Sequence, residues 1–459
     1  MAHGMLDLPA DELDALFARR EARVAVVGFG YIGVVIGAVL ADRGWQVTGI
    51  DVRPEVVGEI TRGTTRVREP GLDDLVARNV GAGRLTATTD FAAVAQQDVV
   101  IVTVGTPLGQ DYEPVVDDIE AAAKGVAAFL TRGQLVVLKS TVPPNTTTGL
   151  VQPILETSGL RAGVDFGLAF CPERLAEGRA VRDLTSIPVV VGGVDARSAD
   201  VCQRLWREAL GVESVVVDSP REAELTKLAD NLWIDLNIAL ANELAKICDK
   251  LGSNVTQVID AANTLPKVNY NVNILMPSMG VGGYCLTKDP WFVHHLGEQL
   301  GLDMLTPQTS RAVNDTMPAY TCELLREQLA LGGKELKDSR VAVLGIAFKN
   351  NTGDCRLTPT RDVVRMLEES GCTLLVHDPW VGPEEALTVT TVPLTATLDD
   401  TIRDADAVVY LTGHQQFRDY PMTRVAELTA QDCVVLDGRN AFQRSDVESA
   451  GLRYKGIGR

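Results

Sequence analysis

A Gly-x-Gly-x-x-Gly pattern between two apolar segments constrains the fold of this chain most strongly. Residues 23–53 read RVAVVGFGYIGVVIGAVLADRGWQVTGIDVR, which predicts a strand, a tight turn, an apolar helix and a second strand closing on Asp51. Gly28, Gly30 and Gly33 fall where the first strand passes into the helix. There they suit a tight turn, a close approach of the backbone to a pyrophosphate, and close packing of helix on strand. The pattern therefore predicts a dinucleotide-binding βαβ unit.

The choice of dinucleotide depends on Asp51 at the end of the second strand. A carboxylate there accepts hydrogen bonds from both ribose hydroxyls and repels a 2′-phosphate, which favours NAD over NADP. Arg53, two residues on, could soften that preference. Tyr31 and Ile32, between the second and third glycines, complete the predicted cofactor site. The alternative is a glycine-rich βαβ unit that holds no cofactor.

The same rhythm continues through the next part of the chain. Apolar strands are expected at 98–104, 134–140 and 167–171, with a helix at 117–130. These strands deliver GTP (105–107), STVPP (140–144) and PERLAEG (172–178). Open α/β sheets bind ligands at the carboxyl ends of their strands. These segments are candidate cofactor and substrate edges, although Thr and Pro are also ordinary turn residues and Glu173 could be a helix cap.

The pattern changes at 219–251, where no Gly or Pro interrupts a helical spacing of leucines. We expect one long helix there, joining two α/β halves and offering a dimer surface. Lys227 and Asn231 lie one turn apart on a face of this helix, and Asp235 follows one turn later. A helical lysine is usually a solvated surface group. The apolar surroundings favour an inward, functional pair.

A cysteine in a glycine-rich loop is the main candidate for chemistry. Residues 279–290 read MGVGGYCLTKDP, in which three glycines precede Cys285 and Lys288 follows it. A thiol is a useful nucleophile only as the thiolate, which a nearby ammonium or helix N-terminus stabilises. The alternative is a small buried cysteine after a tight turn.

Length and composition limit the remaining possibilities. The chain has 459 residues, a formal net charge of −18, five histidines and eight cysteines without a CxxC pair. The length predicts two or three domains, and the negative charge argues against nucleic acid or an anionic membrane as a partner. Scattered cysteines and few histidines predict free thiols in a reducing compartment and no metal site. A cytoplasmic enzyme is the simplest interpretation, since no apolar run approaches a membrane span.

The C-terminal part repeats the α/β pattern in altered form. A linker at 332–339 precedes a strand-turn unit at 340–360, where the first glycine, Gly345, is present without the two that should follow. We expect a Rossmann-like domain that does not hold a dinucleotide in the same way, with further strands at 373–377, 407–411 and 433–437. Lys349 and Arg356 are phosphate-binding candidates near the end of its first strand.

Seven segments in order carry a family resemblance. They are VAVVGFGYIG, GTP, KSTVPP, CPERLAEG, ELTKLADN, GVGGYCLTKDP and GIAFKNNTGDCRLTPT. From about residue 23 to residue 440 the chain resembles the UDP-glucose/GDP-mannose dehydrogenase family, in its UDP-N-acetylhexosamine-like branch. The resemblance implies an α/β fold of two Rossmann-like, doubly wound parallel-sheet domains joined by a long central helix that also forms a homodimer or higher homo-oligomer.

The resemblance also implies an NAD-dependent nucleotide-sugar 6-dehydrogenase. Such an enzyme oxidises a sugar's primary alcohol to a carboxylate with two NAD per turnover. The first hydride transfer gives an aldehyde, and a Cys285 thiolate adds to it as a thiohemiacetal. A second hydride then leaves to give a thioester, from which water releases the acid. This chemistry requires a nucleophile, a donor that steadies an oxyanion, and a carboxylate near the water.

Motif matching assigns the residues of this site. The implied catalytic set has Cys285 as nucleophile, Lys227 and Asn231 steadying the alkoxide and oxyanion, Lys227 also as a candidate proton acceptor, and Asp289, Glu173 and Thr141 organising or deprotonating water. The implied cofactor set is Gly28, Gly30, Tyr31, Ile32, Gly33, Asp51, Arg53, Thr106, Thr141, Lys288 and Arg356. The implied sugar-nucleotide set is Glu173, Arg174, Lys227, Asn231, Lys267, Tyr270, Met279, Gly280, Gly282, Phe348 and Lys349.

Some motifs depart from one branch or the other. PER and GVGG match enzymes that act on UDP-N-acetylhexosamines, whereas YCL and KDP match the UDP-glucose group. Thr287 replaces a common proline, and the segment 263–278 carries Lys267 where an arginine often reaches the substrate across the dimer. The first choice of substrate is UDP-GlcNAc or UDP-ManNAc, and UDP-glucose is the alternative. A family member that has lost one half-reaction is a further alternative, as is a non-catalytic nucleotide-sugar-binding protein on the same scaffold.

The expected domain order follows from these segments. A leader at 1–21 with a short amphipathic helix at 10–20 precedes an NAD-binding domain at 22–218. A central helical dimerisation domain with the cysteine loop is expected at 219–331, and a UDP-sugar-binding domain at 332–459.

Overall fold

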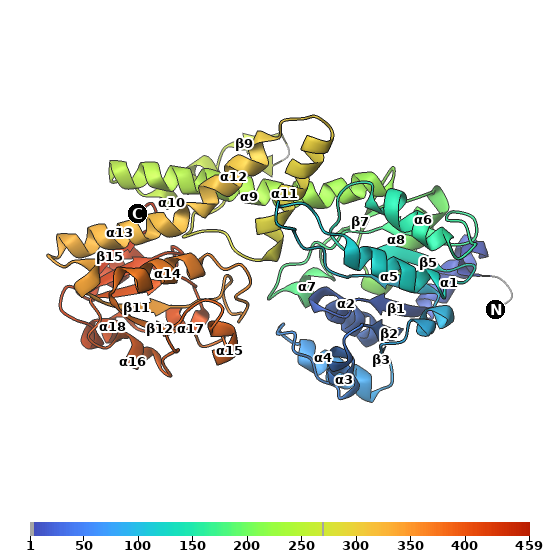
Figure 1. Cartoon of the computed structure of the whole chain (residues 1–459), viewed down its shortest axis with the longest axis horizontal. Coiled ribbons are helices and arrows are strands. Elements are labelled where there is room, and N and C mark those ends of the chain that lie inside the picture. The colour runs from blue at the N-terminus through green and yellow to red at the C-terminus, as the bar shows by residue number, and fades with distance from the viewer. Residues whose placement is uncertain (1–3, 269) are drawn as a thin grey trace. The chain divides into compact units, whose positions relative to one another are not determined.

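The computed structural model describes residues 4–268 and 270–459, which form two compact units divided after Asp230 (Figure 1). Residues 1–3 of the expected leader, and Asn269 in the segment before the cysteine loop, lie outside the described residues. Each unit is built around its own sheet. The predicted α/β class with two Rossmann-like sheets and a long central helix is confirmed.

The first unit contains an eight-stranded sheet in the order β3-β2-β1-β4-β5-β6-β7-β8. All neighbours pair in parallel except β6 and β7, which are antiparallel. The strands are β1 (Arg23–Val27), β2 (Gln46–Ile50), β3 (Leu85–Thr88), β4 (Val99–Val102), β5 (Leu135–Leu138), β6 (Gly167–Phe170), β7 (Val189–Gly193) and β8 (Ser214–Val217). The order 3-2-1-4-5-6 is that of a dinucleotide-binding fold, with its switch point between β1 and β4.

Side-chain alternation along β1 shows why the sheet is buried on both faces. Val24 and Val26 belong to one apolar core, with α2 and α8, whereas Ala25 and Val27 belong to another, with α5. The helices of this unit are α1 (Ala10–Ala18), α2 (Tyr31–Asp42), α3 (Pro54–Thr61), α4 (Leu72–Gly81), α5 (Asp117–Ala127), α6 (Gln152–Glu156), α7 (Ala180–Asp183) and α8 (Ala196–Leu210). Strands that are apolar on both faces require such covering layers.

The N-terminal helix packs onto this unit. Leu13, Leu16 and Phe17 of α1 are buried, as their spacing predicted. Asp14 on the same helix accepts hydrogen bonds from Arg204 and Arg207 of α8, with contacts of 2.7 and 2.9 Å. The segment expected as a leader is therefore part of the first unit.

The long helix predicted at 219–251 is confirmed as α9 (Pro220–Leu251), which passes through the division between the units. Leu228 is fully buried, whereas Trp233, Leu236, Leu240 and Ile247 are exposed. The helix therefore buries one apolar face and leaves another uncovered within the chain.

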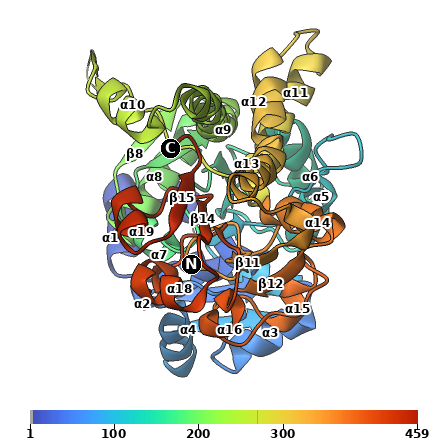
Figure 2. The same ribbon diagram turned by 90° about the vertical axis from the view of Figure 1, so that its left-hand side faces the viewer.

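The second unit contains a five-stranded, wholly parallel sheet in the order β12-β11-β13-β14-β15. Its strands are β11 (Arg340–Leu344), β12 (Thr373–His377), β13 (Ala407–Tyr410), β14 (Val434–Asp437) and β15 (Arg453–Gly456), and a separate hairpin pairs β9 (Pro266–Lys267) with β10 (Tyr270–Asn271). Its helices are α10 (Val255–Ala262), α11 (Tyr284–Gln299), α12 (Leu305–Asp315), α13 (Met317–Leu331), α14 (Thr360–Ser370), α15 (Pro383–Ala386), α16 (Leu398–Ile402), α17 (Gln415–Arg418), α18 (Met422–Leu428) and α19 (Arg444–Ser449). Helix α13 packs beside α14 (Figures 1 and 2).

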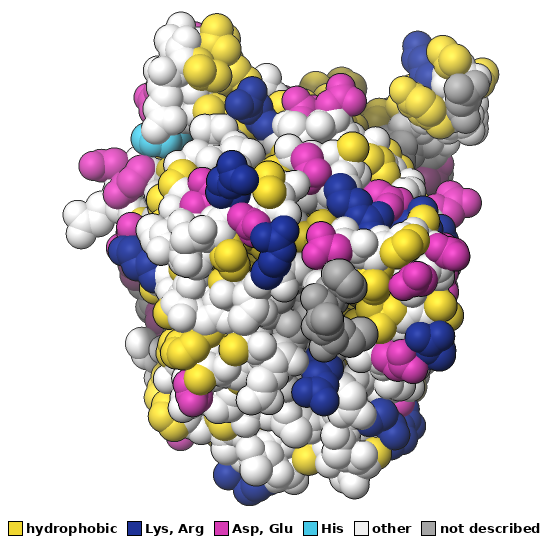
Figure 3. All heavy atoms as spheres, turned by 90° about the vertical axis from the view of Figure 1, so that its right-hand side faces the viewer, with side chains coloured by type: hydrophobic (Ala, Val, Ile, Leu, Met, Phe, Trp, Pro, Cys, Tyr) yellow, Lys and Arg dark blue, Asp and Glu magenta, His cyan; other side chains and the backbone are white. Residues whose placement is uncertain are grey.

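Figure 3 shows one face of the molecule. On that face, Lys and Arg side chains are interspersed with Asp and Glu among the described residues, so neither sign of charge dominates. An extended basic surface is what a nucleic-acid-binding domain needs. Among the described residues, no helix combines the length and apolar character that crossing a membrane requires.

Candidate active site

The three glycines of the first unit meet different surroundings. Gly28 adopts φ +85°, and a Cβ at this residue would lie 2.7 Å from a Val104 methyl. A Cβ on Gly33 would lie 2.2 Å from the Gly28 carbonyl oxygen, so helix and strand could not pack as they do. A Cβ on Gly30 would meet no protein atom within 4 Å. The first and third glycines therefore serve the fold, and the second borders open space.

Asp51 is held as a carboxylate beside this turn. It accepts hydrogen bonds from the backbone N–H of Phe29 at 2.9 Å and from the Arg53 guanidinium at 3.0 and 3.1 Å. Burial alone would raise the pKa of Asp51, but the hydrogen bonds from Arg53 and Phe29 outweigh it and lower the pKa. The group is thus ionised at neutral pH and can accept hydrogen bonds.

A cavity of about 440 Å³ opens over these groups. Gly28, Gly30, Asp51, Arg53 and the strand-end residue Thr103 all line it. It lies at the carboxyl ends of β1, β2 and β4, where the strand order reverses. Its features fit an NAD molecule: backbone access at Gly30, the N-terminus of α2 for a pyrophosphate, and a carboxylate for ribose hydroxyls.

Two further strand ends meet next to one another. Thr106, after β4, donates a hydrogen bond from its hydroxyl to the Thr141 carbonyl oxygen, after β5, at 2.5 Å. Thr106 is buried, whereas Thr141 is partly exposed. The contact fixes the GTP and STVPP loops against each other and leaves Thr141 accessible.

Glu173 and Lys227 form a buried ion pair within the first unit. The Lys227 ammonium lies 3.7 Å from the Glu173 carboxylate, and their side chains are only 6 % and 10 % exposed. The neighbouring Arg174 donates to Asp230 of α9 at 2.8 Å, which holds the PERLAEG segment against the helix. The structure thus brings together two residues that the sequence placed far apart.

Tyr31 and Glu69 connect the glycine turn to the end of this segment. The Tyr31 hydroxyl donates to the Glu69 carboxylate, which also accepts from the backbone N–H groups of Gly178 and Ala180 at 2.7 Å each. Burial and the bond to Glu69 raise the pKa of Tyr31 far above its ordinary value. Ile32, by contrast, packs against the apolar core.

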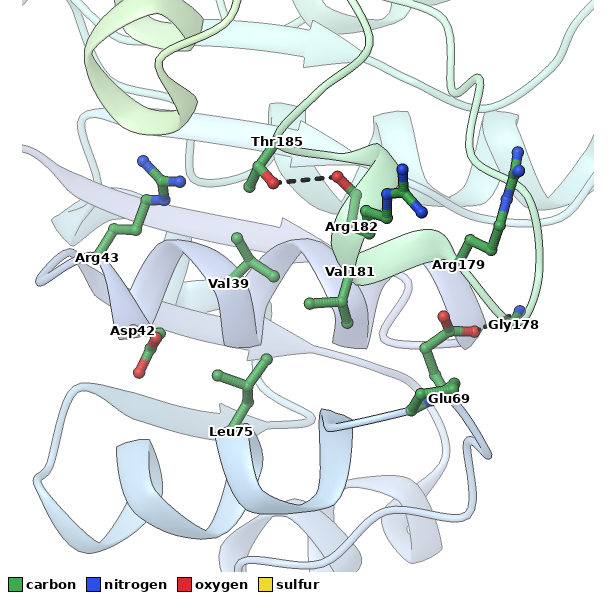
Figure 4. Close-up of a pocket in the computed structure, with 11 residues that line it drawn as sticks. Val39, Asp42, Arg43, Glu69, Leu75, Gly178, Arg179, Val181, Arg182 and Thr185 are labelled. Carbon is green, nitrogen blue, oxygen red and sulfur yellow. Dashed lines mark hydrogen bonds between the residues drawn. The ribbon is translucent and has the colours of Figure 1, made fainter.

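Glu69 also borders a second hollow of about 510 Å³ between α2, α4 and α7 (Figure 4). Val39 and Val181 form part of its apolar wall, and Arg43 and Arg182 lie around its edge. The predicted site residues are not among the described residues that line it.

The second unit presents the cysteine loop. Cys285 is exposed in the first turn of α11, immediately after Gly283, which adopts φ +87°. The Thr287 hydroxyl donates to the Gly283 carbonyl at 2.8 Å, so it fastens the turn in which a proline was expected. The exposed thiol at a helix N-terminus is placed where a thiolate is favoured.

A buried polar chain lies one turn further into α11. The Lys288 ammonium contacts Asp289 at 2.5 Å and lies 4.3 Å from the centre of the Phe292 ring. Asp289 is fully buried and accepts a second hydrogen bond from the Asn231 amide. The charge of Lys288, the ammonium that the sequence offered to the thiolate, is therefore balanced by Asp289.

Close packing explains the glycines of this loop. A Cβ on Gly282 would lie 2.6 Å from Pro359 and 2.7 Å from the Phe348 side chain, and one on Gly280 would lie 2.7 Å from Pro359. The Met279 side chain is wholly buried in the core of the second unit, so only its backbone could face a ligand. The loop is thus seated on the segment that follows β11.

The other predicted sugar-nucleotide residues are more exposed. Lys267 and Tyr270 pair across the β9–β10 hairpin and are both exposed. Lys349 follows Phe348 and is partly exposed, whereas Arg356 is bound to Asp354, with a nitrogen-to-oxygen contact of 2.8 Å. The structure places Phe348 directly beside the glycine loop and keeps the hairpin as a separate element.

Comparison with known proteins decides the family. The NAD binding domain of the UDP-glucose/GDP-mannose dehydrogenase family matches residues 22–210, its central domain matches 221–316, and its UDP binding domain matches 342–444. The chain belongs to this family. It is therefore a relative of NAD-dependent nucleotide-sugar oxidoreductases, and its first unit is an NAD-binding unit.

Three relatives show the breadth of this dehydrogenase family. A UDP-N-acetyl-D-mannosamine dehydrogenase from Pyrococcus horikoshii is 33 % identical, covering 95 % of this chain and 99 % of its own, and its solved structure has a TM-score of 0.84. An NDP-N-acetyl-D-galactosaminuronic acid dehydrogenase from Ralstonia solanacearum is 35 % identical, with coverage of 91 % and 96 %. A UDP-glucose dehydrogenase structure from Pyrobaculum islandicum is 33 % identical, with a TM-score of 0.84 and coverage of 95 % and 98 %.

Cys285 differs from the other thiols of this dehydrogenase. Cys285 is exposed, whereas Cys372 is half-buried and the other six cysteines are buried. Burial raises the pKa of both Cys322 and Cys433 to about 12. Among the described residues, no group of three His, Cys, Asp or Glu side chains could hold a metal ion.

Two further buried charged residues, which sequence reasoning missed, lie next to predicted site segments. Lys139 is buried and donates to the carbonyls of Cys171 and Pro172 at 3.3 and 3.2 Å, directly before Glu173. Glu224 is fully buried and accepts from the backbone N–H groups at the start of the segment after STVPP. A lysine ending the apolar strand LVVL was a usable signal for the first, whereas the glutamate looks like any helical surface residue.

Proposed function

We propose that this protein is an NAD-dependent UDP-sugar 6-dehydrogenase that carries out both oxidations, from primary alcohol to carboxylate. The main support is the pairing of two buried polar groups on successive turns of α9. Lys227 pairs with Glu173, Asn231 pairs with Asp289, and an exposed Cys285 lies in the same helix as Asp289. Burying charged groups costs free energy even when they are paired, and such groups cluster at functional sites, so acid–base chemistry on a sugar alcohol is a role that fits them.

The proposed roles follow from the chemistry of these side chains. Bound NAD supplies the oxidant for both two-electron oxidations, so two NAD are consumed per sugar. Lys227 steadies the alkoxide and is a candidate acceptor of the alcohol proton, and Asn231 donates to the oxyanion. The Cys285 thiolate adds to the aldehyde carbon, the carbonyl oxygen takes a proton, and a thiohemiacetal forms.

Release of the acid uses the carboxylates. Oxidation of the thiohemiacetal leaves a thioester on Cys285, and water then attacks its carbonyl carbon as the carbon–sulfur bond breaks. Glu173, Asp289 and Thr141 are assigned to organise or deprotonate this water. The products are the uronic acid and a free thiol, so the enzyme returns to its starting state.

We infer a UDP-N-acetylhexosamine, UDP-GlcNAc or UDP-ManNAc, as substrate. The relatives from Pyrococcus and Ralstonia carry names of N-acetylhexosamine or N-acetylhexosaminuronic acid enzymes. UDP-glucose is the second candidate, because the UDP-glucose dehydrogenase from Pyrobaculum is as similar in identity and TM-score as the Pyrococcus enzyme. Fold similarity alone does not separate these sugars.

The experiment is a panel of UDP-glucose, UDP-GlcNAc, UDP-ManNAc, UDP-galactose and GDP-mannose with NAD, following NADH and the sugar product. Two NADH per sugar and a uronic acid are expected with an N-acetylhexosamine. One NADH per sugar would indicate a truncated reaction, and tight sugar-nucleotide binding without NADH would indicate a binding protein. Cys285→Ser should abolish acid formation and leave NAD binding intact, and full acid production by this variant would exclude the covalent route.

We also propose a homodimer through α9. Trp233, Leu236, Leu240 and Ile247 are 46, 40, 45 and 55 % exposed and recur at helical spacing. An apolar stripe of this kind is typical of an interface. Leu240→Lys should shift the protein towards monomer in sedimentation, whereas the same change at Leu331, exposed at the end of α13, should not. A Leu240→Lys protein that sediments like wild type would remove this assignment.

A further inference from the structure

A buried ionic network joins α9 to α12 in the second unit. Asp235 of α9 is fully buried and accepts hydrogen bonds from Ser310 at 2.7 Å, Arg311 at 2.7 Å and Asn314 at 2.8 Å. Arg311 is itself almost completely buried and also pairs with Asp315. Apolar side chains could join the two helices without the desolvation free energy of a buried ion pair. We therefore looked for a role of this pair other than holding the helices together.

One end of this network reaches the turn that carries Cys285. Pro290 lies inside α11 and has no N–H, so it cannot donate to the Leu286 carbonyl as a helical residue at that position would. The Arg311 guanidinium donates to that carbonyl at 3.4 Å. This bond is weaker than the one to Asp235, but it is charge-assisted and it occupies an acceptor that the helix leaves open. Helices α11 and α12 pack side by side (Figures 1 and 2).

The other end of the network reaches the start of the glycine loop. Asn314 accepts a hydrogen bond from the Asn242 amide at 2.9 Å. The Asn242 side-chain oxygen in turn accepts from the backbone N–H of Ser278 at 2.9 Å. Ser278 then donates to the Gly280 carbonyl at 2.9 Å. The same buried network therefore contacts the backbone on both sides of the segment that presents the thiol.

We propose that Asp235, Asn242, Arg311 and Asn314 form a loop clamp, a set of positioning residues that fixes where Cys285 points. Its catalytic meaning rests on the proposed function, because only a nucleophile needs such placement. A loop with glycines at 280, 282 and 283 has many accessible conformations, so restraining it from both ends removes most of them. A displacement of about 1 Å at a reacting group can cost on the order of 100-fold in rate.

The test removes both buried charges together, so that neither is left unpaired. Asp235→Leu/Arg311→Met should lower kcat about 100-fold while KM for the sugar nucleotide and for NAD changes by less than about threefold. In the substrate-free protein, amide hydrogen exchange of residues 279–287 should accelerate at least about tenfold. The exchange measurement needs no turnover, so it still tests the clamp if no sugar nucleotide is oxidised by the wild type.

Pro290→Ala supplies a rescue that a purely structural role would not allow. Alanine returns an N–H that can donate to the Leu286 carbonyl, so it should restore kcat of the double variant at least about tenfold. The substitution is also made in the wild-type background, and rescue is taken as the ratio of its effects in the two backgrounds. A ratio near one would show that Arg311 does not act through this carbonyl.

Lys455→Met provides the matched control. Lys455 pairs with Asp249, a half-buried residue further along α9 whose hydrogen bonds among the described residues go to Tyr320, Lys455 and Gly458 and not to the glycine loop. Its removal should lower Tm without changing exchange at 279–287. Unchanged exchange in Asp235→Leu/Arg311→Met would overturn the clamp. Faster exchange with unchanged kcat would show that the loop is held but that its placement does not matter for the reaction.

Discussion

Gly30→Ala should separate cofactor binding from folding in the first unit. Gly30 has φ −78° and ψ −155°, an extended conformation that alanine adopts readily, and its Cβ would meet no protein atom within 4 Å. The added methyl would project towards the cavity where a pyrophosphate must approach the backbone. We therefore expect a change of under about 0.5 kcal/mol in the free energy of unfolding.

The loss in affinity can be estimated from the hydrogen bonds at stake. Pushing the pyrophosphate away weakens one or two charge-assisted bonds from backbone N–H groups, each contributing about 1.5–3 kcal/mol. The dissociation constant for NAD should rise about 10- to 100-fold. Titration calorimetry measures this directly, and the stabilisation of Tm by NAD should shrink in parallel.

Gly33→Ala should do the reverse. Its Cβ would lie 2.2 Å from the Gly28 carbonyl oxygen, so β1 and α2 must move apart. Overpacking of this kind costs about 1–3 kcal/mol, or roughly 3–9 °C in Tm. Gly81→Ala in α4 is the control, because its Cβ meets nothing within 4 Å and lies outside the cavity. Normal NAD affinity in Gly30→Ala, or a stable Gly33→Ala that fails only to bind NAD, would refute the division of roles.

Three other predictions concern the titrating groups. Alkylation of the native protein near pH 8 should modify the exposed Cys285. Cys322 and Cys433, whose pKa burial raises to about 12, should stay unmodified, as mass spectrometry can show. Modification of these two buried thiols at the same rate as Cys285 would contradict the prediction. Because the folded pKa of Asp51 lies below its ordinary value of 3.8, its bonds should stabilise the first unit fully above that pH and lose their contribution as the pH falls further. The difference in unfolding free energy between wild type and Asp51→Asn should therefore be constant from pH 7 to about 5 and shrink in more acidic solution; a difference that grows there has the wrong sign. Lys227→Met should lower kcat by a factor of about 10²–10⁴. It should also lower Tm, because the buried Glu173 carboxylate loses the ammonium that lies 3.7 Å from it. Activity within tenfold of wild type would show that Lys227 has no part in the proposed chemistry.

The features that could be predicted from the sequence are those that depend on residues close together in the chain. The glycines at 28, 30 and 33 each meet the surroundings expected of them, and α9 begins within one residue of its predicted start. Predicted strands run a little longer than observed, for example 98–104 against Val99–Val102 for β4, because apolar residues continue past the last ladder bond. Apolar periodicity reports burial, whereas strand ends depend on pairing.

What could not be predicted depends on partners distant in sequence. Strands β3, β7, β8 and β15 were not anticipated, and the antiparallel pairing of β7 with β6 departs from a wholly parallel sheet. The sequence VVVGG fits a parallel and an antiparallel strand equally well, because a strand that is apolar on both faces contains no signal for the orientation of its neighbour. Glu69 and Arg311 were missed for a related reason, since a single charged residue looks solvated until its partner in the fold is known.

The second unit shows how the loss of two glycines changes the use of one fold. Gly345 adopts φ +86°, as Gly28 adopts +85°, and Asp378 ends β12 and accepts from the backbone of the turn as Asp51 does. The two carboxylates differ in their side-chain partner, because Asp378 contacts the fully buried His414 at 3.1 Å, whereas Asp51 contacts the exposed Arg53.

In the second unit, the position equivalent to Gly33 explains where helix α14 starts. Asn350 occupies it and its side-chain oxygen accepts a hydrogen bond from Gly413 N–H at 2.8 Å. A side chain there prevents the close helix–strand packing that Gly33 permits, so α14 begins only at Thr360 rather than directly after the turn. The chain between them becomes a long loop that carries Phe348 against the cysteine loop. The second unit thus lacks the glycine turn of a dinucleotide site and has a long loop there, in the region that matches the family's UDP binding domain.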